Sequence, residues 1–171
     1  MATVLIVGAS RVLDTTYLAE NPTLRATVDE ERLAQSFIVR EIGALDGGDV
    51  VLTGGCPYSG DRWALEHVLS LRRFHGSTLD LAEYRTDGLQ AWASGKAGRR
   101  WYASDGYAKA LERDDYLASK ALELQQRGYD VRGFFVEASW SPTHGASYTA
   151  RQMRALGLFA AVQRIERSEE R

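Results

Sequence analysis

Short apolar runs alternate with helical patterns along the chain, and this alternation constrains the fold more than any other feature. The runs typical of strands cover residues 3–7, 50–53, 77–84, 131–136 and 158–165. Apolar residues at helical spacing cover about 29–45, 61–74, 105–127 and a stretch around 148–156. Strands that alternate with helices form a parallel sheet covered on both faces. We therefore predict an α/β fold, a doubly wound, Rossmann-like parallel sheet with flanking helices.

The size of the chain fits one domain with its own core. It has 171 residues, of which 44% are hydrophobic, which is ample for a core. We predict a single domain over residues 1–171. The stretch at about 86–104 departs from the alternation because glycines, basic residues and the aromatics Trp92, Trp101 and Tyr102 are mixed in and around it. It is predicted to be an irregular excursion, and long loops of this kind are often functional.

Charge and cysteine content exclude several classes of partner. The formal net charge is −2, which gives no overall field to attract a long nucleic acid or an anionic membrane. The single cysteine, Cys56, excludes an internal disulfide framework and a cysteine-based metal site. No run approaches the roughly 18 apolar residues of a membrane span, and the N-terminus does not resemble a signal peptide. We expect a cytoplasmic protein without a metal, a cofactor, a membrane or a long nucleic acid.

Three loops are the expected place of function. Doubly wound sheets bind ligands at the carboxyl ends of their strands, and here the loops at those ends are residues 8–11, 53–61 and 137–147. In the first loop, Gly8, Ser10 and Arg11 combine a small-residue bend with a hydroxyl and a guanidinium, which can hold a phosphate or a carboxylate. The alternative is that Arg11 is a solvated surface charge.

The second loop is rich in glycine and leads into a helix. Its candidate ligand-binding residues are Thr53, Gly54, Gly55, Ser59, Gly60 and Asp61. Glycines let backbone approach a ligand, and the first amides of a helix favour negative charge; tight turns also use glycine for geometry alone. Asp61 would repel a phosphate there, so it fits a ribose hydroxyl or a base amino group better. Its ordinary interpretation is a favourable charge on the helix dipole or a helix cap.

The third loop supplies a second candidate anion cradle ahead of a helix. Its hydroxyl-bearing and small residues are Ser139, Ser141, Thr143, Gly145 and Ser147. His144 titrates near neutral pH and is either a ligand contact or a surface residue. Glu137, at the exit of the strand, is the best-placed carboxylate for general acid or base work.

One carboxylate interrupts the apolar face of the helix at 105–127. Asp114 follows Ala110 by four residues and precedes Leu117 by three. Because an unpaired buried carboxylate is costly, Asp114 either pairs with a basic group or points at a site at the sheet edge. Arg113 can reach the same region.

These short motifs together resemble a known superfamily. The first element comprises Thr53, Gly54, Gly55, Ser59, Gly60 and Asp61; the middle one Trp101, Gly106, Ala110, Arg113 and Asp114; the last Ser141, Gly145 and Ala146. The combination resembles the SLOG superfamily of Rossmann-like nucleotide-binding domains, especially its YspA-like branch, over roughly residues 3–165. Asp114 stands where the branch usually has Asn, and Ala146 where it usually has Thr. The glutamate pair of the cytokinin-activating phosphoribohydrolases is absent from this sequence, so their hydrolytic chemistry is not implied.

Three hypotheses follow. The first is a module that binds a nucleotide or nucleoside-derived small molecule as a sensor or sequestering device, which the resemblance implies. The second is an N-glycosidic hydrolase or transferase, similar to nucleoside deoxyribosyltransferases, with Glu137, Asp61 and Asp114 as candidate catalytic carboxylates. The third is a non-catalytic protein-interaction module that uses the excursion at 86–104. We expect a homodimer or a higher homo-oligomer.

Overall fold

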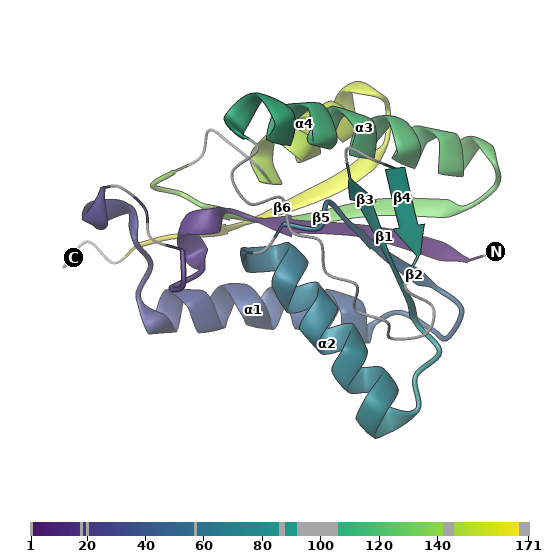
Figure 1. The fold of residues 1–171 in the computed structure, drawn as a ribbon, viewed down its shortest axis with the longest axis horizontal. Coiled ribbons are helices and arrows are strands. Elements are labelled where there is room, and N and C mark those ends of the chain that lie inside the picture. Colours follow the sequence, from purple (N-terminus) through teal and green to yellow (C-terminus); the bar gives the residue numbers. More distant parts are fainter. Residues whose placement is uncertain are drawn as a thin grey trace.

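A computed structural model describes residues 2–17, 19, 21–56, 58–85, 88–91, 106–141 and 146–167. Its centre is a sheet with the strand order β4-β3-β2-β1-β5-β6 (Figure 1). The strands are β1 (Thr3–Ala9), β2 (Val50–Thr53), β3 (Asp80–Arg85), β4 (Gly88–Ala91), β5 (Asp130–Ala138) and β6 (Phe159–Ile165). All neighbouring strands pair in parallel except β3 and β4, which are antiparallel.

Helices cover both faces of this sheet, as Figure 1 shows. The helices α1 (Val28–Gly43) and α2 (Ser59–His75) lie on one face, and α3 (Gly106–Gln126) and α4 (Ala146–Ala155) lie on the other. Two 3-10 turns, η1 (Arg11–Leu13) and η2 (Pro22–Leu24), lie between β1 and α1. The predicted doubly wound, Rossmann-like fold is confirmed.

The core consists of two layers, one on each side of the sheet. Along β1, Leu5 and Val7 belong to the layer that includes α1 and α2 residues, and Val4 and Ile6 to the layer that includes α3 and α4 residues. A strand that is buried on both faces is apolar at consecutive positions. This is why β1 is a continuous apolar run rather than an alternating one.

Local sequence signals position the helices. Thr27 accepts the Glu30 amide at 3.1 Å, and the Glu30 side chain accepts the Thr27 amide at 2.8 Å. This reciprocal capping box starts α1 close to the predicted position. Gly76 ends α2 with a φ of 62°, a left-handed conformation in which glycine is favoured.

Part of the stretch predicted to be an irregular excursion, residues 88–91, is a strand. This strand, β4, pairs with β3, with Leu89 opposite Tyr84. The Asp-Gly pair at 87–88 is a sequence signal of a hairpin that explains this strand. Residues 86–87 and 92–105, with the three aromatics singled out above, lie outside the described residues. No helix in the described part of the chain is long and apolar enough to cross a membrane.

Candidate functional site

The candidate site lies where the order of the parallel strands reverses, between β1 and β5. From β1 the chain continues to the α1 face, and from β5 it continues to the α4 face. Ligands of open α/β sheets bind outside the carboxyl ends of the strands at such a switch point. Ser10 ties the two strand ends together, because its amide donates to the Val136 carbonyl at 2.9 Å and its Oγ accepts the Ala138 amide at 3.1 Å. Ser10 is therefore a buried part of the frame.

Polar side chains on either side of the loop after β2 hydrogen-bond to the loop's backbone. Thr53 Oγ1 accepts the Gly55 amide at 3.2 Å, and Asp61 Oδ2 accepts the Cys56 amide at 2.8 Å. Gly55 has a φ of 73°, which an L side chain rarely adopts. Asp61 thus shapes the loop from the first turn of α2, a role that sequence reasoning did not assign to it.

Gly60 brings α2 into direct contact with the end of β1. A Cβ at this position would lie 2.6 Å from both the Ala9 amide nitrogen and the Gly8 carbonyl carbon. The next residue towards the N-terminus, Ser59, has a φ of 55° and donates its hydroxyl to the Ala9 carbonyl at 2.9 Å. For Gly60 the geometric explanation of the glycine is sufficient, since only glycine fits.

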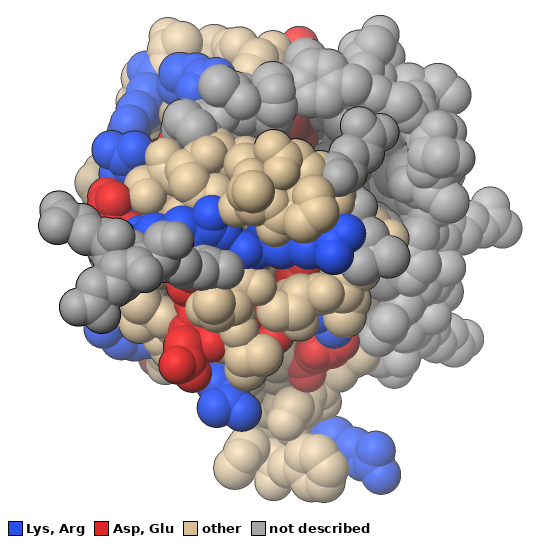
Figure 2. All heavy atoms as spheres, turned by 90° about the vertical axis from the view of Figure 1, so that its left-hand side faces the viewer, with Lys and Arg blue, Asp and Glu red and all other residues tan. Residues whose placement is uncertain are grey.

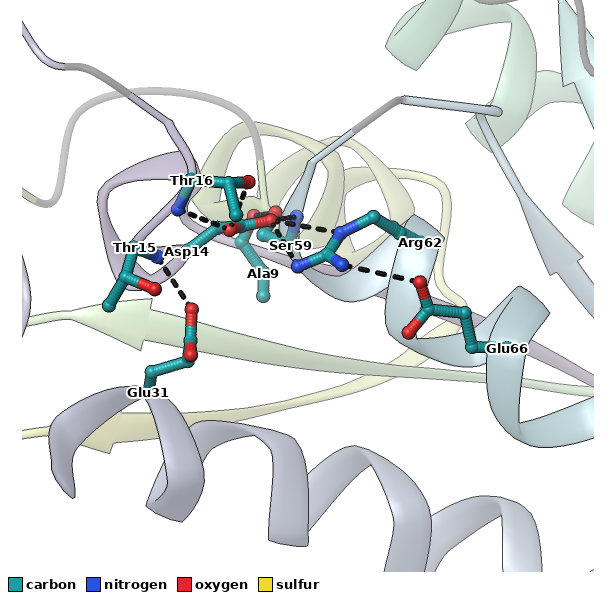
Figure 3. A network of polar contacts seen from close by, with 8 residues as sticks. All are labelled: Ala9, Asp14, Thr15, Thr16, Glu31, Ser59, Arg62 and Glu66. Carbon is teal, nitrogen blue, oxygen red and sulfur yellow. Dashed lines mark hydrogen bonds and ion pairs between the residues drawn. The ribbon is translucent and has the colours of Figure 1, made fainter. Parts of the chain in front are cut away.

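A buried carboxylate holds this helix start in place (Figure 3). Asp14 is 1% exposed. Its Oδ1 accepts the Thr16 amide at 2.9 Å and the Thr16 hydroxyl at 2.6 Å. Its Oδ2 accepts the Ser59 amide at 2.7 Å and the Arg62 guanidinium at 3.0 and 3.2 Å. Asp14 therefore joins the segment after β1 to the start of α2.

The charge state of Asp14 follows from these contacts. Burial raises the pKa of Asp14, but hydrogen bonds from Ser59 and Thr16 and the charge of Arg62 outweigh it, so the pKa lies below its ordinary value. The sequence analysis did not single out Asp14. The sequence did contain a signal for its role, because Asp14 precedes Thr16 by two residues. At this spacing an aspartate side chain commonly accepts a hydrogen bond from the backbone.

The network extends to two helices. Arg62 also pairs with Glu66 one turn further along α2, at 3.2 Å. Burial lowers the pKa of Arg62, and the two carboxylates Asp14 and Glu66 raise it by more. On the other side, Glu31 of α1 accepts the Thr15 amide at 2.6 Å. The loop after β1 is thus fixed to both α1 and α2.

Ionisable groups from other segments of the chain influence the pKa of Arg11. Burial lowers the pKa of its guanidinium, but the neighbouring Cys56, Tyr17 and Asp114 raise it by more. Cys56, the largest of the groups that raise it, is 6% exposed. Arg11 as a residue is exposed, although enough protein surrounds its guanidinium for burial to contribute. Arg11 itself lies in η1, directly after β1 and thus at the carboxyl edge of the sheet.

Asp114 is buried, as its place on the apolar face of the helix predicted. It is 5% exposed, and its charge contributes to the raised pKa of Arg11. Both alternatives, an ion pair with a basic group and a position at the site on the sheet edge, therefore stay predictions. The side chain of Arg113 lies outside the described part.

Glu137 and Glu83 lie in the carboxyl-terminal halves of β5 and β3. Glu137 Oε2 is 3.9 Å from the Arg164 guanidinium, directly opposite on β6, a long ion pair of small strength. Glu83 is 1% exposed and pairs in register with Thr53 of β2. Sequence reasoning missed Glu83, although a glutamate inside an apolar strand is a signal of a special environment.

Helix α4 begins beside the end of β1. A Cβ on Gly8 would lie 3.8 Å from the Ala146 Cβ, and the next residue, Ser147, is 5% exposed. The Ser147 hydroxyl has no hydrogen-bond partner within the described residues. Ser139 and Ser141 are half-buried in the turn after β5. Thr143, His144 and Gly145 lie outside the described residues, so the predictions for them stay predictions.

Figure 2 shows the left-hand side of Figure 1, the side towards which the parallel strands point. Basic side chains form a band across this face, and acidic side chains gather below it. Within the described ranges, no group of three or more histidine, cysteine or acidic side chains is arranged to hold a metal ion.

Comparisons with known proteins add no further constraint. No protein-family model matches this chain, no curated protein is similar to it, and no solved structure matches it.

Proposed function

We propose that this protein binds a nucleotide or a nucleoside-derived small molecule at the carboxyl ends of its strands, as a sensor or sequestering module. The observation that carries the proposal is the position of Arg11 in η1, directly after β1 at the switch point, where the charges of Cys56 and Asp114 contribute to its raised pKa. A guanidinium recognises phosphate or carboxylate groups. A carboxylate accepts hydrogen bonds from ribose hydroxyls or base amino groups.

The start of α4 supports the same proposal. It lies beside Gly8, and a helix N-terminus favours an anion. The buried Ser147 hydroxyl has no partner in the described part of the chain, so it is available to a ligand oxygen. Arg11 and α4 together would suit a ligand that carries a negative group next to a sugar or a base.

The buried Asp114 favours a second candidate, cleavage or exchange of an N-glycosidic bond. Such chemistry needs a carboxylate at the anomeric carbon and a group that protonates the leaving base. Asp114, which is 5% exposed and whose charge contributes to the raised pKa of Arg11, would suit the first task. Asp114 is the least exposed of the three candidate carboxylates, so it is the first of the three to test.

The first experiment identifies the ligand. Mass spectrometry of small molecules released from the purified, denatured protein would reveal a nucleotide or nucleoside, and the native protein is then incubated with that compound. An intact compound after incubation supports the binding module. Release of a free base that stops in Asp114→Asn supports the enzyme. If no compound is retained and no nucleotide binds in a screen, both the binding module and the enzyme are contradicted. That result would favour the protein-interaction hypothesis.

Arg11→Gln tests the site itself. Because hydrogen bonds to a charged group contribute about 1.5–3 kcal/mol, we expect binding about 10- to 100-fold weaker by calorimetry. Arg127→Gln is the matched control, since Arg127 is exposed just beyond α3 and no side-chain contact involves it within the described residues. Equal affinity of the two variants would contradict the proposed site.

The cellular setting and the assembly are part of the same proposal. A cytoplasmic location fits a chain with one cysteine. A homodimer or higher homo-oligomer stays a prediction, which light scattering on the eluting protein tests directly.

A further inference from the structure

Arg167, which follows β6, joins segments that are far apart in sequence. Its guanidinium stacks on the Trp140 ring, with Cζ 3.8 Å from the ring centroid. It donates hydrogen bonds to the carbonyls of Thr23 and Arg25, which lie 144 and 142 residues away in the chain. Its Nε is 3.5 Å from a carboxylate oxygen of Glu30 in α1. One side chain thus contacts the turn after β5, the segment around η2 and the start of α1.

The contacts around Arg167 reinforce one another. Trp140 Nε1 donates to the Leu24 carbonyl at 2.8 Å, so the ring is held by the same segment that receives the guanidinium. The Arg167 side chain is 20% exposed, which limits competition by water. Stacked cations and charged hydrogen bonds are each stronger when they are partly desolvated.

Two hydrogen bonds connect this cluster to the candidate site. Ala138, two residues before Trp140, donates its amide to Ser10 Oγ at 3.1 Å. Ala26, next to Arg25, donates its amide to the Val12 carbonyl at 3.1 Å. Arg11 lies between Ser10 and Val12, so the segments that Arg167 contacts are hydrogen-bonded to the two residues that flank Arg11.

We propose that Arg167 and Trp140 form a conformational latch that holds residues 21–27 and 139–141 as one unit around Arg11. When the latch opens, both segments loosen together while the sheet stays folded. The inference concerns the protein without a ligand, so it stands or falls independently of the proposed function. An arginine that merely covers surface would affect neither segment.

Amide hydrogen exchange of the ligand-free protein tests this directly. Useful reporters are the Arg25, Ala26, Ser139 and Ser141 amides, each of which donates to a backbone carbonyl. In Arg167→Ala we expect both groups of reporters to exchange at least about tenfold faster, with β1 and β5 unchanged, because local openings are separate from global unfolding. Arg127→Ala is the matched control and should leave all of them unchanged.

For Arg167→Ala, three results would overturn the latch. They are unchanged exchange, an equal increase of exchange in every strand, and a change in only one of the two segments. Arg167→Lys keeps the charge but lacks the planar fork that serves two carbonyls. It should therefore resemble Arg167→Ala, and wild-type exchange in Arg167→Lys would also overturn the proposal.

A double variant tests whether the two residues act as one device. If they do, Arg167→Ala combined with Trp140→Leu should exchange no more than about twofold faster than the faster single variant, because the second change removes a contact that is already lost. If the two effects multiply, the residues act separately and the latch is wrong.

Discussion

The buried carboxylate of Asp14 accepts the backbone amide of Ser59 at 2.7 Å, across 45 residues of sequence. This hydrogen bond fixes the end of the loop after β2 to the segment after β1. Both loops border the candidate site. The same oxygen receives the Arg62 guanidinium. The site is therefore framed by a polar network rather than by apolar packing alone.

Replacement of Asp14 by Asn should destabilise the protein. The amide would place its NH₂ group against donors that now meet an oxygen, and the Arg62 charge would lose its buried partner. We expect a loss of roughly 2–4 kcal/mol in the free energy of unfolding, measured by urea denaturation. Asp46→Asn removes an exposed carboxylate and should stay within about 0.5 kcal/mol of wild type. Similar losses in both variants would contradict the role of Asp14.

The lowered pKa of Asp14 predicts a specific acid sensitivity. A carboxyl group whose pKa is lower in the folded state than in the unfolded state stabilises the fold at pH values above its unfolded-state pKa, which is about 3.9. That contribution is lost as the pH falls from there through the folded pKa. The stability gap between wild type and Asp14→Asn should thus be constant from about pH 7 to 5 and shrink below about pH 4. If the stability difference between the two proteins grew as the pH fell, the pKa of Asp14 would not be lowered in the folded state.

The fold could be predicted from sequence because it depends on local patterns. Strands β1, β2, β5 and β6 are apolar runs, and the long helices carry their own spacing and termination signals, such as the capping box of Thr27 and Glu30. Burial on both faces then follows from the alternation of strands and helices. The antiparallel β4 was missed because a short strand with glycine on one side and polar residues around it has little apolar signal.

The candidate site could be predicted only in part. Arg11 and Asp114 were found because a basic residue after a strand and a carboxylate on an apolar helix face are visible in sequence. Asp14 and Glu83 were missed, since the partners that justify a buried carboxylate lie far away along the chain. The expectation for Asp61 placed a ligand at its carboxylate, whereas the Cys56 amide already occupies one of its oxygens.

Gly60→Ala tests how closely α2 approaches β1. The added methyl group would lie 2.6 Å from backbone atoms of Gly8 and Ala9, which cannot move without shifting the strand. We expect a loss of at least about 2 kcal/mol in unfolding free energy. Gly43→Ala is the control, because a Cβ there meets nothing within 4 Å, and alanine in a helix should stabilise by about 0.5–1 kcal/mol. A tolerated Gly60→Ala would contradict the close contact.

The backbone of Ser59 allows two opposing effects to be separated. Its φ of 55° is unfavourable for any residue with a Cβ, while its hydroxyl donates to the Ala9 carbonyl. Ser59→Ala loses the hydrogen bond and keeps the unfavourable φ; Ser59→Gly loses the same bond but relieves the strain. Because left-handed backbone costs about 1 kcal/mol for a residue other than glycine, the glycine variant should be more stable than the alanine variant by about that amount. Thermal unfolding of the two variants side by side measures this difference. If the alanine variant were equally stable, the left-handed conformation would carry no strain, and the Asp14 bond to the Ser59 amide would not be needed to maintain it.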